Sequence, residues 1–384
     1  MPLGRARRGR PFFNMGRQLA NNLTNANTTN FKAGINALKA GTRDCNILCI
    51  GDSLTSGQGS NGAINGLRPN SYPSVLAGLL GTRFSVTQSL NNFFGLQGIT
   101  IANYPLYDTK FVNSSAIASS TVNSIGGPIV TATTDTPFMQ FTPDTAFDQV
   151  DYMLVGRAGI QSLQATGGTG ETLNTASIAN GAVLAGTWNL ASGNESILKV
   201  IGGGSGTGFG CSGLILRNST LRRLCVLNGG WRGSTTVQWT PNPSGNAYDP
   251  YKMVNALQGI RPIDLILINI GTNDMASGTP STYATQLNRL VGQVKLAGTD
   301  VIIVLPHRYQ SVEEGSATHA TAAMIDQYLQ AMRDTASSNG IGWIDVPSQT
   351  GTYTQMNALG QMFDVTHPNQ SGYARIASLI DTAL

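Results

Sequence analysis

The sequence predicts an α/β protein whose parallel sheet is interrupted by an inserted β-sandwich. Near both ends of the chain, helical patterns alternate with short apolar runs, which is typical of doubly wound sheets. Between residues 99 and 227, short apolar or alternating runs instead follow one another, separated by turns rich in Gly, Asn, Ser and Thr. Strands without intervening helices favour a β-sandwich of the jelly-roll type. With 384 residues, the chain is long enough for two domains.

The predicted elements divide the chain into a basic N-terminal arm (1–29), a discontinuous α/β domain (30–98 and 228–384) and the insert (99–227). The expected elements of the α/β domain are a helix over 30–40, a strand over 47–50, helices over 71–80 and 251–257, a strand over 265–270, a helix over 282–296, a strand over 301–305, a helix over 317–338, a strand over 342–346 and a helix over 372–384. The expected strands of the insert are 137–142, 148–155, 160–165, 183–190, 196–201, 212–217 and 223–227.

The distribution of charge argues against a general nucleic-acid surface. The formal net charge is +4, but five arginines lie in the first seventeen residues, and without them the balance is −1. The arm that carries them has several open roles: contact with nucleic acid, membrane phosphates or a partner protein, assembly into a homo-oligomer or a virion, or a disordered solubilising tail. The five are Arg5, Arg7, Arg8, Arg10 and Arg17.

We expect a soluble protein, cytoplasmic as synthesised, without a Sec signal peptide or a membrane span. No apolar segment follows the arginines, and no run of about eighteen apolar residues occurs. Action outside the cell would then need another export route, lysis, or attachment to a phage particle. Only 11% of the residues are charged and 46 are Gly, a composition that suits surfaces that hydrogen-bond to sugars.

The four cysteines predict no disulfide framework. Cys45 and Cys49 bracket one strand, too far apart to bridge, whereas Cys211 and Cys225 fall in separate strand-like runs and could face one another. Buried free thiols are the expectation, as in a reducing cytoplasm. The spacings match no zinc pattern.

Ser53 is the candidate nucleophile for acyl transfer. It follows the apolar run 47–50 in Gly51-Asp52-Ser53-Leu54, which places its hydroxyl at the carboxyl edge of a sheet, where open α/β folds build their sites. A helix-capping serine is the simple alternative. The segment does not fit the Gly-x-Ser-x-Gly elbow of α/β-hydrolases.

His367 and Asp364 are the candidate base and its orienting carboxylate. Their spacing lets the carboxylate reach one imidazole nitrogen while the other faces the serine. The chain has two other histidines. We expect His307, which follows a strand, to be structural or a substrate contact, and His319, in a polar stretch, to be a solvated surface residue.

Two segments supply candidate donors for the oxyanion. Asn273 follows the apolar strand 265–270 through Gly271-Thr272, and its amide can donate to developing negative charge. Gly233 can offer a backbone N–H at the same edge, although both segments also fit ordinary turns or flexible loops.

Taken in chain order, the segments that contain Ser53, Gly233, Asn273 and Asp364-Val365-Thr366-His367 resemble the four blocks of the SGNH (GDSL) hydrolases. The resemblance implies a three-layer α/β/α sandwich and no metal or organic cofactor. It assigns Ser53 as nucleophile, His367 as general base and then acid, and Asp364 as its orienter. The oxyanion donors would be the N–H groups of Ser53 and Gly233 and the Asn273 side chain. One departure is the unusually long stretch between the first two blocks, which leaves Gly230 as a competitor of Gly233.

We therefore expect a serine esterase that removes O-acetyl groups from a polysaccharide. The insert returns to the α/β domain just before Gly230, so it should overhang the site, where it can bind polymer or act only as a cap or oligomer contact. Two other readings stay open. One is a lipid or aryl esterase. The other is a non-catalytic virion or adhesion component that binds glycan.

Overall fold

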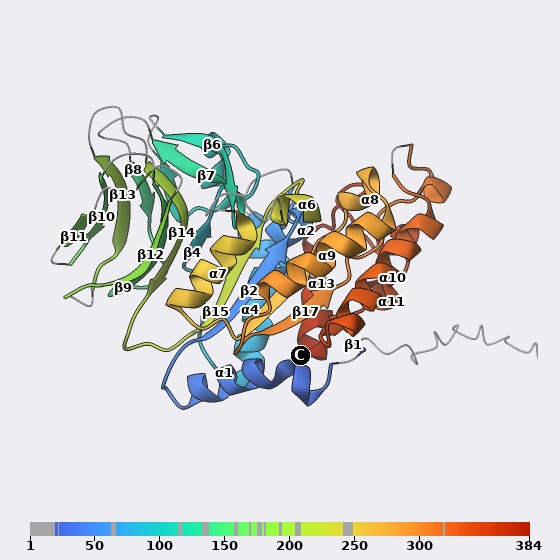
Figure 1. The fold of residues 1–384 in the computed structure, drawn as a ribbon, viewed down its shortest axis with the longest axis horizontal. Helices are drawn as coiled ribbons and strands as arrows, with labels where there is room; N and C mark the ends of the chain where they lie inside the picture. Colours follow the sequence, from blue (N-terminus) through green and yellow to red (C-terminus); the bar gives the residue numbers. More distant parts are fainter. Residues whose placement is uncertain are drawn as a thin grey trace, which may run out of the picture.

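The computed structural model of the chain contains a parallel sheet covered by helices, with a β-sandwich beside it (Figure 1). The predicted α/β fold with an inserted β-sandwich is confirmed. Residues 1–19 and 22 of the predicted arm (1–29) lie outside the described residues. The structure describes residues 20–21, 23–62, 67–113, 117–132, 138–156, 160–168, 170–174, 179, 182–191, 194–203, 209–240, 249–317 and 319–384.

The central sheet has seven strands in the order β1-β18-β17-β16-β2-β15-β3. All neighbours pair in parallel except β1 and β18. Every residue of β2, β15, β16, β17 and β18 is buried, which explains their continuous apolar runs. The bounds are β1 Ala20–Asn21, β2 Cys45–Gly51, β3 Gln88–Ser89, β15 Leu224–Gly230, β16 Leu265–Asn269, β17 Asp300–Val304 and β18 Gly342–Ile344.

Helices cover both faces of this sheet because alternate strand residues point in opposite directions. Leu48 and Ile50 of β2 pack into a core shared with α7, α9 and α10, whereas Ile47 and Cys49 pack into a core shared with α1, α4 and α13. The bounds are α1 Thr29–Lys39, α4 Tyr72–Phe84, α7 Pro250–Ile260, α9 Pro280–Val294, α10 Ala322–Ser338 and α13 Gln370–Ala383.

The prediction of a helix over 317–338 was wrong at its beginning. Thr321 caps α10, and its side chain accepts a hydrogen bond from the Met324 N–H. The preceding residues form a short 3-10 helix, η3 (Val312–Glu314), and a loop. A threonine whose hydroxyl caps the helix marks the start of the helix more accurately than apolar periodicity does.

The sandwich consists of two antiparallel sheets. One has the order β11-β10-β13-β8-β5, and the other has the order β12-β9-β14-β7-β6, with β4 paired to β14. Their apolar inner faces enclose a core of their own. The bounds are β4 Asn92–Phe94, β5 Phe111–Asn113, β6 Ile117–Ser124, β7 Gly127–Ala132, β8 Phe138–Phe141, β9 Gln149–Val155, β10 Ile160–Thr166, β11 Thr172–Asn174, β12 Val183–Asn189, β13 Ile197–Gly203 and β14 Phe209–Arg217.

The expected limits of the insert need two corrections. The run 223–227 belongs to β15, which pairs in parallel with β2 along seven residue pairs and is therefore a strand of the central sheet. At the other limit, β4 lies before residue 99 but pairs with β14 of the sandwich. Two short helices, η2 (Ile101–Asn103) and α5 (Tyr104–Tyr107), also interrupt the predicted succession of strands. The sequence of an apolar run does not determine which sheet the strand joins.

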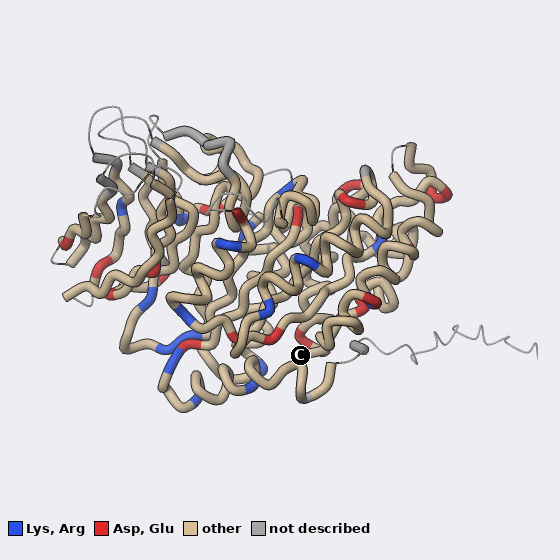
Figure 2. Tube along the Cα trace, in the orientation of Figure 1, with Lys and Arg blue, Asp and Glu red and all other residues tan. Residues whose placement is uncertain are grey.

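The sandwich meets the α/β unit through a network of four charged residues, of which three are buried and Arg217 is half-buried. Arg217 and Asp151 come from the sandwich, whereas Arg261 and Asp44 come from the α/β unit. Arg261 Nη2 lies 3.0 Å from Asp44 Oδ2, Arg261 Nη1 lies 3.4 Å from Asp151 Oδ2, and Arg217 Nη2 lies 2.7 Å from Asp151 Oδ1. Charged segments of both signs meet at this junction (Figure 2).

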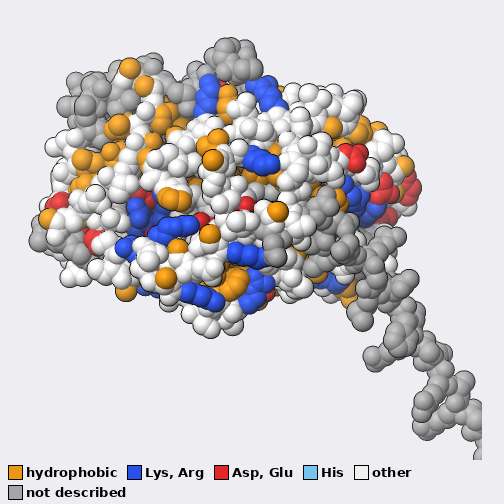
Figure 3. All heavy atoms as spheres, turned by 60° about the horizontal axis from the view of Figure 1, so that its bottom comes forward, with side chains coloured by type: hydrophobic (Ala, Val, Ile, Leu, Met, Phe, Trp, Pro, Cys, Tyr) orange, Lys and Arg blue, Asp and Glu red, His pale blue; other side chains and the backbone are white. Residues whose placement is uncertain are grey.

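All four cysteines are buried and free, as expected. In the part of the chain that the structure describes, no helix is long and apolar enough to cross a membrane. Lys and Arg side chains are scattered in small groups over the face shown in Figure 3, between uncharged side chains.

Removing Arg261 should destabilise the protein strongly. Arg261→Ala leaves Asp44 and Asp151 buried with one arginine between them, so we expect the free energy of unfolding to fall by about 3–5 kcal/mol. Urea denaturation would measure this loss. The matched control is Arg308→Ala at the surface pair Arg308–Asp326, which should cost at most about 1 kcal/mol. Equal losses in the two variants would contradict the assigned role of this network.

Candidate active site

Ser53 lies at the carboxyl end of β2, where the strand passes directly into the one-turn helix α2 (Ser53–Ser56). Asp52 caps this turn by accepting a hydrogen bond of 3.0 Å from the Leu54 N–H. Gly51 is required by close packing, because a Cβ there would lie 1.9 Å from the carbonyl oxygen of Asn269 in β16. The strand end therefore holds the Ser53 hydroxyl at the edge of the sheet.

His367 reaches Ser53 from the loop that precedes α13. Its Nε2 lies 3.0 Å from Ser53 Oγ, and its Nδ1 lies 2.9 Å from Asp364 Oδ2. Asp364 Oδ1 also accepts the backbone N–H groups of Thr366 (2.7 Å) and His367 (2.6 Å). With the Nδ1 proton directed at Asp364, Nε2 is left to accept the serine proton.

Asp364 is held in its ionised form. Partial burial alone would raise its pKa, but the hydrogen bonds from the His367 ring and backbone outweigh this effect and lower the pKa to about 2. A carboxylate that remains charged at neutral pH can stabilise an imidazolium at His367. The structure thus brings together the three residues that the sequence analysis selected for the triad.

The other two histidines surround the same loop. His307 is buried, and its Nε2 lies 2.9 Å from the carbonyl oxygen of Thr366. Burial lowers the pKa of His307 to about 4, so the neutral ring donates this hydrogen bond. His319 is half-buried, with Nδ1 3.0 Å from Gln310 O and Nε2 3.3 Å from Thr366 Oγ1. The prediction of a solvated His319 was wrong, because both ring nitrogens contact residues of the protein and the ring is partly covered.

Two backbone donors face the site without a hydrogen-bond partner among the described residues: the N–H groups of Ser53 and Gly233. Gly233 is exposed with a φ of +74°, and a Cβ there would meet no atom within 4 Å. Gly230 differs, because its N–H donates to Asn228 Oδ1 (3.0 Å) and a Cβ would lie 2.2 Å from Ser56 N. Of the two glycines, only Gly233 has an accessible N–H.

Asn273 follows β16 and lies beside the Gly233 loop. Its Nδ2 donates to the carbonyl oxygen of Ser234 over 2.9 Å. One amide hydrogen is therefore used to join this side chain to the residue after Gly233. A side-chain amide carries two N–H hydrogens and is a donor type that stabilises oxyanions in acyl transfer.

Two carboxylates that the sequence analysis did not select tie these loops together. Asp274 Oδ1 accepts the N–H (3.1 Å) and the hydroxyl (2.5 Å) of Thr236, which follows Gly233 by three residues. Asp52 Oδ2 accepts the Thr272 N–H over 3.3 Å. Burial raises the pKa of Asp274, and it raises that of Asp52 to about 6, against the effect of these hydrogen bonds. The only sequence signal was their position beside Ser53 and Asn273.

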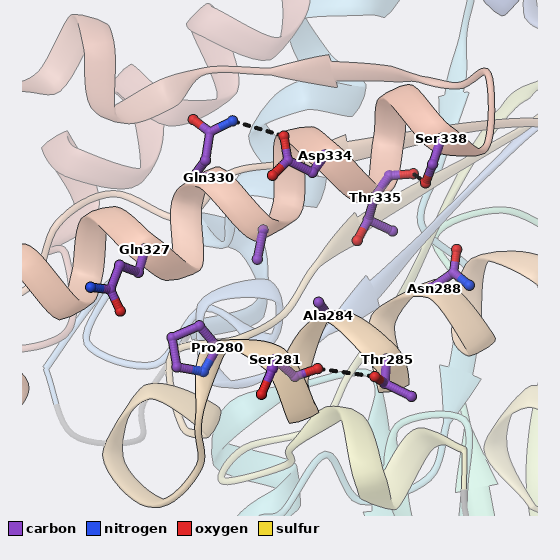
Figure 4. A pocket seen from close by; sticks show the side chains of 11 residues that line it. Pro280, Ser281, Ala284, Thr285, Asn288, Gln327, Gln330, Asp334, Thr335 and Ser338 are labelled. Atoms are coloured by element: carbon purple, nitrogen blue, oxygen red, sulfur yellow. Dashed lines mark hydrogen bonds between the residues drawn. The ribbon is translucent and has the colours of Figure 1, made fainter.

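The structure offers no evident site for a metal: among the described residues, no group of three or more His, Cys, Asp or Glu is placed to hold one. A groove of about 860 Å³ lies elsewhere, between α9 and α10 (Figure 4). Its lining is mostly neutral and polar, and Gln330 donates to Asp334 one turn further along α10. None of the candidate catalytic residues lines this groove.

Comparison with known proteins adds family and fold information. Residues 203–375 match the model of the GDSL-like lipase/acylhydrolase family, a range that contains Gly233, Asn273, Asp364 and His367 but not Ser53. No curated protein sequence matches the chain.

Among solved structures, a peptidoglycan O-acetylesterase aligns over 95% of this chain and 97% of its own, with a TM-score of 0.70 and 15% identity. The protein YXIM of Bacillus subtilis covers 71% of this chain and 88% of its own (TM-score 0.35, 15% identity). A carbohydrate acetylesterase family member from Sinorhizobium meliloti covers 41% and 76% (TM-score 0.32, 19% identity). The first likeness is one of fold, and it extends over both the α/β unit and the sandwich.

The Asp274–Thr236 contact should matter for turnover. In Asp274→Ala, the loop that carries Gly233 loses the hydrogen bonds from Thr236 to Asp274. We therefore expect kcat on p-nitrophenyl acetate to fall about 10- to 100-fold with KM nearly unchanged. Asp274→Asn keeps an acceptor oxygen and should recover part of this loss. The surface variant Asp334→Ala is the control. A rise in KM alone, in folded protein, would contradict a role in positioning the oxyanion donors.

The buried Asp52 should make stability depend on pH. Its pKa of about 6 in the folded protein lies above its ordinary value of about 4. The fold therefore favours the neutral carboxyl, and this contribution is lost as the pH rises through 6. Relative to Asp52→Asn, the wild-type protein should lose thermal stability between about pH 4 and about pH 6. A difference in Tm that stays constant over this range would argue against the raised pKa.

Proposed function

We propose that this chain, whose residues 203–375 match the GDSL-like lipase/acylhydrolase family, is a carboxylic ester hydrolase of the SGNH/GDSL type that removes O-acetyl groups from a polysaccharide. The observation that carries the proposal is the hydrogen-bonded chain from Asp364 through His367 to Ser53. The whole-chain likeness to a peptidoglycan O-acetylesterase supports an acetylated polysaccharide as the substrate.

In the first half of the reaction, Ser53 Oγ attacks the acetyl carbonyl carbon while His367 Nε2 takes the serine proton. Asp364 stabilises the resulting imidazolium. The negative charge that develops on the carbonyl oxygen is bound by the N–H groups of Ser53 and Gly233 and by the Asn273 amide. Collapse of this intermediate breaks the bond to the sugar oxygen, which takes the proton from His367 and leaves as a hydroxyl.

In the second half, water attacks the acetyl-Ser53 ester. His367 takes a proton from the water, and the same three donors bind the second oxyanion. Breakdown releases acetate and returns the proton to Ser53 Oγ. The neutral His307 and the ionised Asp364 hold the loop of His367 in place through both steps.

We assign the sandwich the role of presenting polymer to Ser53. Support comes from the segment that links it to the site. The Tyr107 hydroxyl donates to the carbonyl oxygen of Ser56 over 2.9 Å, and Gln97 Nε2 donates to the carbonyl oxygen of Asn228 over 2.8 Å. Both contacts lie within a few residues of the nucleophile or of Gly233, so a glycan bound to the sandwich near this segment would lie close to the reacting serine.

The test is acetate release from O-acetylated peptidoglycan and O-acetylated xylan, with p-nitrophenyl acetate as a simple ester. Ser53→Ala and His367→Ala should each lower kcat by about 10³-fold or more, and the double variant should be no worse than either single one. Ser378→Ala, an exposed serine of α13, is the matched control.

Other outcomes discriminate the alternatives. Faster turnover of butyrate or longer esters than of acetate would favour a lipid or aryl esterase. Binding of glycan without any hydrolysis would favour an adhesion component. Wild-type turnover by folded Ser53→Ala protein would falsify the assignment of the nucleophile.

A further inference from the structure

Large apolar side chains are exposed beside the candidate triad. Nine are exposed among the described residues, and three of them lie in the short segment that leads to His367: Leu359, Phe363 and Val365. Phe363 is 46% exposed and Val365 is 42% exposed, and they flank Asp364 in sequence. Isolated exposed apolar residues need no explanation, but a group beside a reactive centre indicates a contact surface for a ligand.

The backbone holds Phe363 close to the main chain of His367. The N–H of Phe363 donates to the carbonyl oxygen of His367 over 2.8 Å, so the two residues close a tight turn. Gly59, in the loop that follows Ser53, lies against both: a Cβ there would be 3.0 Å from the Cβ atoms of Phe363 and His367. Phe363 therefore starts at the rim of the site, between the nucleophile loop and the loop of the base.

The chemistry of the reaction determines which part of the ester lies on the His367 side of the site. The carbonyl oxygen must face the N–H groups of Ser53 and Gly233, and the leaving oxygen must face His367, which protonates it. A side chain adjacent to His367 at the rim therefore meets the alcohol part of the ester. Under the proposed function that alcohol is a sugar, whose ring presents an apolar face of C–H groups.

We propose that Phe363, together with Val365, forms a leaving-group subsite that packs against the apolar face of the sugar ring carrying the acetyl ester. The proposal rests on the proposed function. An aromatic ring that is half exposed in the free enzyme gains burial when the sugar binds. This contact holds the sugar oxygen near His367 Nε2 and contributes nothing to an ester with a small alcohol.

The experiment compares sugar esters with an ester that has no sugar. The probes are glucose pentaacetate and O-acetylated xylan on one side and ethyl acetate on the other. Ethyl acetate is chosen over p-nitrophenyl acetate because an aromatic leaving group would itself pack on Phe363. For Phe363→Ala we expect KM on the sugar esters to rise about tenfold with little change in kcat, whereas kcat/KM on ethyl acetate changes less than twofold.

Two further variants sharpen the test. Phe363→Trp keeps an aromatic face and should retain a wild-type KM on the sugar esters. Leu296→Ala removes a side chain that is 40% exposed before β17, at the opposite edge of the sheet, and should change neither substrate class.

Four results would overturn the subsite, the last of them together with the proposed function. An equal loss on sugar esters and ethyl acetate would make Phe363 a structural part of the His367 loop. A changed preference between acetyl and butyryl esters would place Phe363 on the acyl side. If Phe363→Ala leaves KM unchanged on a sugar ester that the wild-type enzyme hydrolyses, the subsite is overturned but the proposed function is not. Wild-type enzyme that hydrolyses ethyl acetate but neither sugar ester would overturn the proposed function, and the sugar subsite with it.

Discussion

The parallel register of β15, β2 and β16 is the constraint on which the site depends. Gly51 at the end of β2 pairs with Gly230 of β15 and with Asn269 of β16, so the three strands end at one level. Beyond each strand end, the backbone continues past the edge of the sheet and reaches one of the three candidate oxyanion donors within four residues. Because parallel strands share this edge, residues far apart in sequence converge there without any local signal.

The same register explains how a long insertion is tolerated between the first two functional segments. The sandwich lies between β2 and β15 in sequence, but these strands pair along their whole length, so the chain returns to the level that it left. The buried charges of Asp44, Asp151 and Arg261, with the half-buried Arg217, join the two units at the seam. A cooperative charge cluster with several partners for each carboxylate fixes orientation better than a single contact does.

Within the site, buried polar groups supply the positioning, and the surroundings of Asp364 and His307 set the charge of each. Asp364 is ionised because several N–H groups point at it, whereas His307 is neutral because burial disfavours its charge. Asp52 and Asp274 join the loops of the nucleophile, Gly233 and Asn273. Under the proposed function, these hydrogen bonds would preorganise the candidate oxyanion donors, so that reaction at an ester requires little rearrangement of them.

Local sequence was sufficient for features that depend on near neighbours. The apolar runs of β2, β16 and β17, the periodicity of α9 and α13 and the three-residue spacing of Asp364 and His367 all predicted their structures, because each reflects burial or hydrogen bonding within a few residues. Tertiary structure was needed wherever a partner comes from elsewhere in the chain. The run 223–227 looked like a sandwich strand because its apolar pattern is the same in either sheet, and only pairing with β2 assigns it. Likewise, His319 and Asp274 acquired their roles from loops that lie 47 and 38 residues away in sequence. The accessible N–H of Gly233, in contrast to the engaged one of Gly230, follows from hydrogen bonds that composition does not encode.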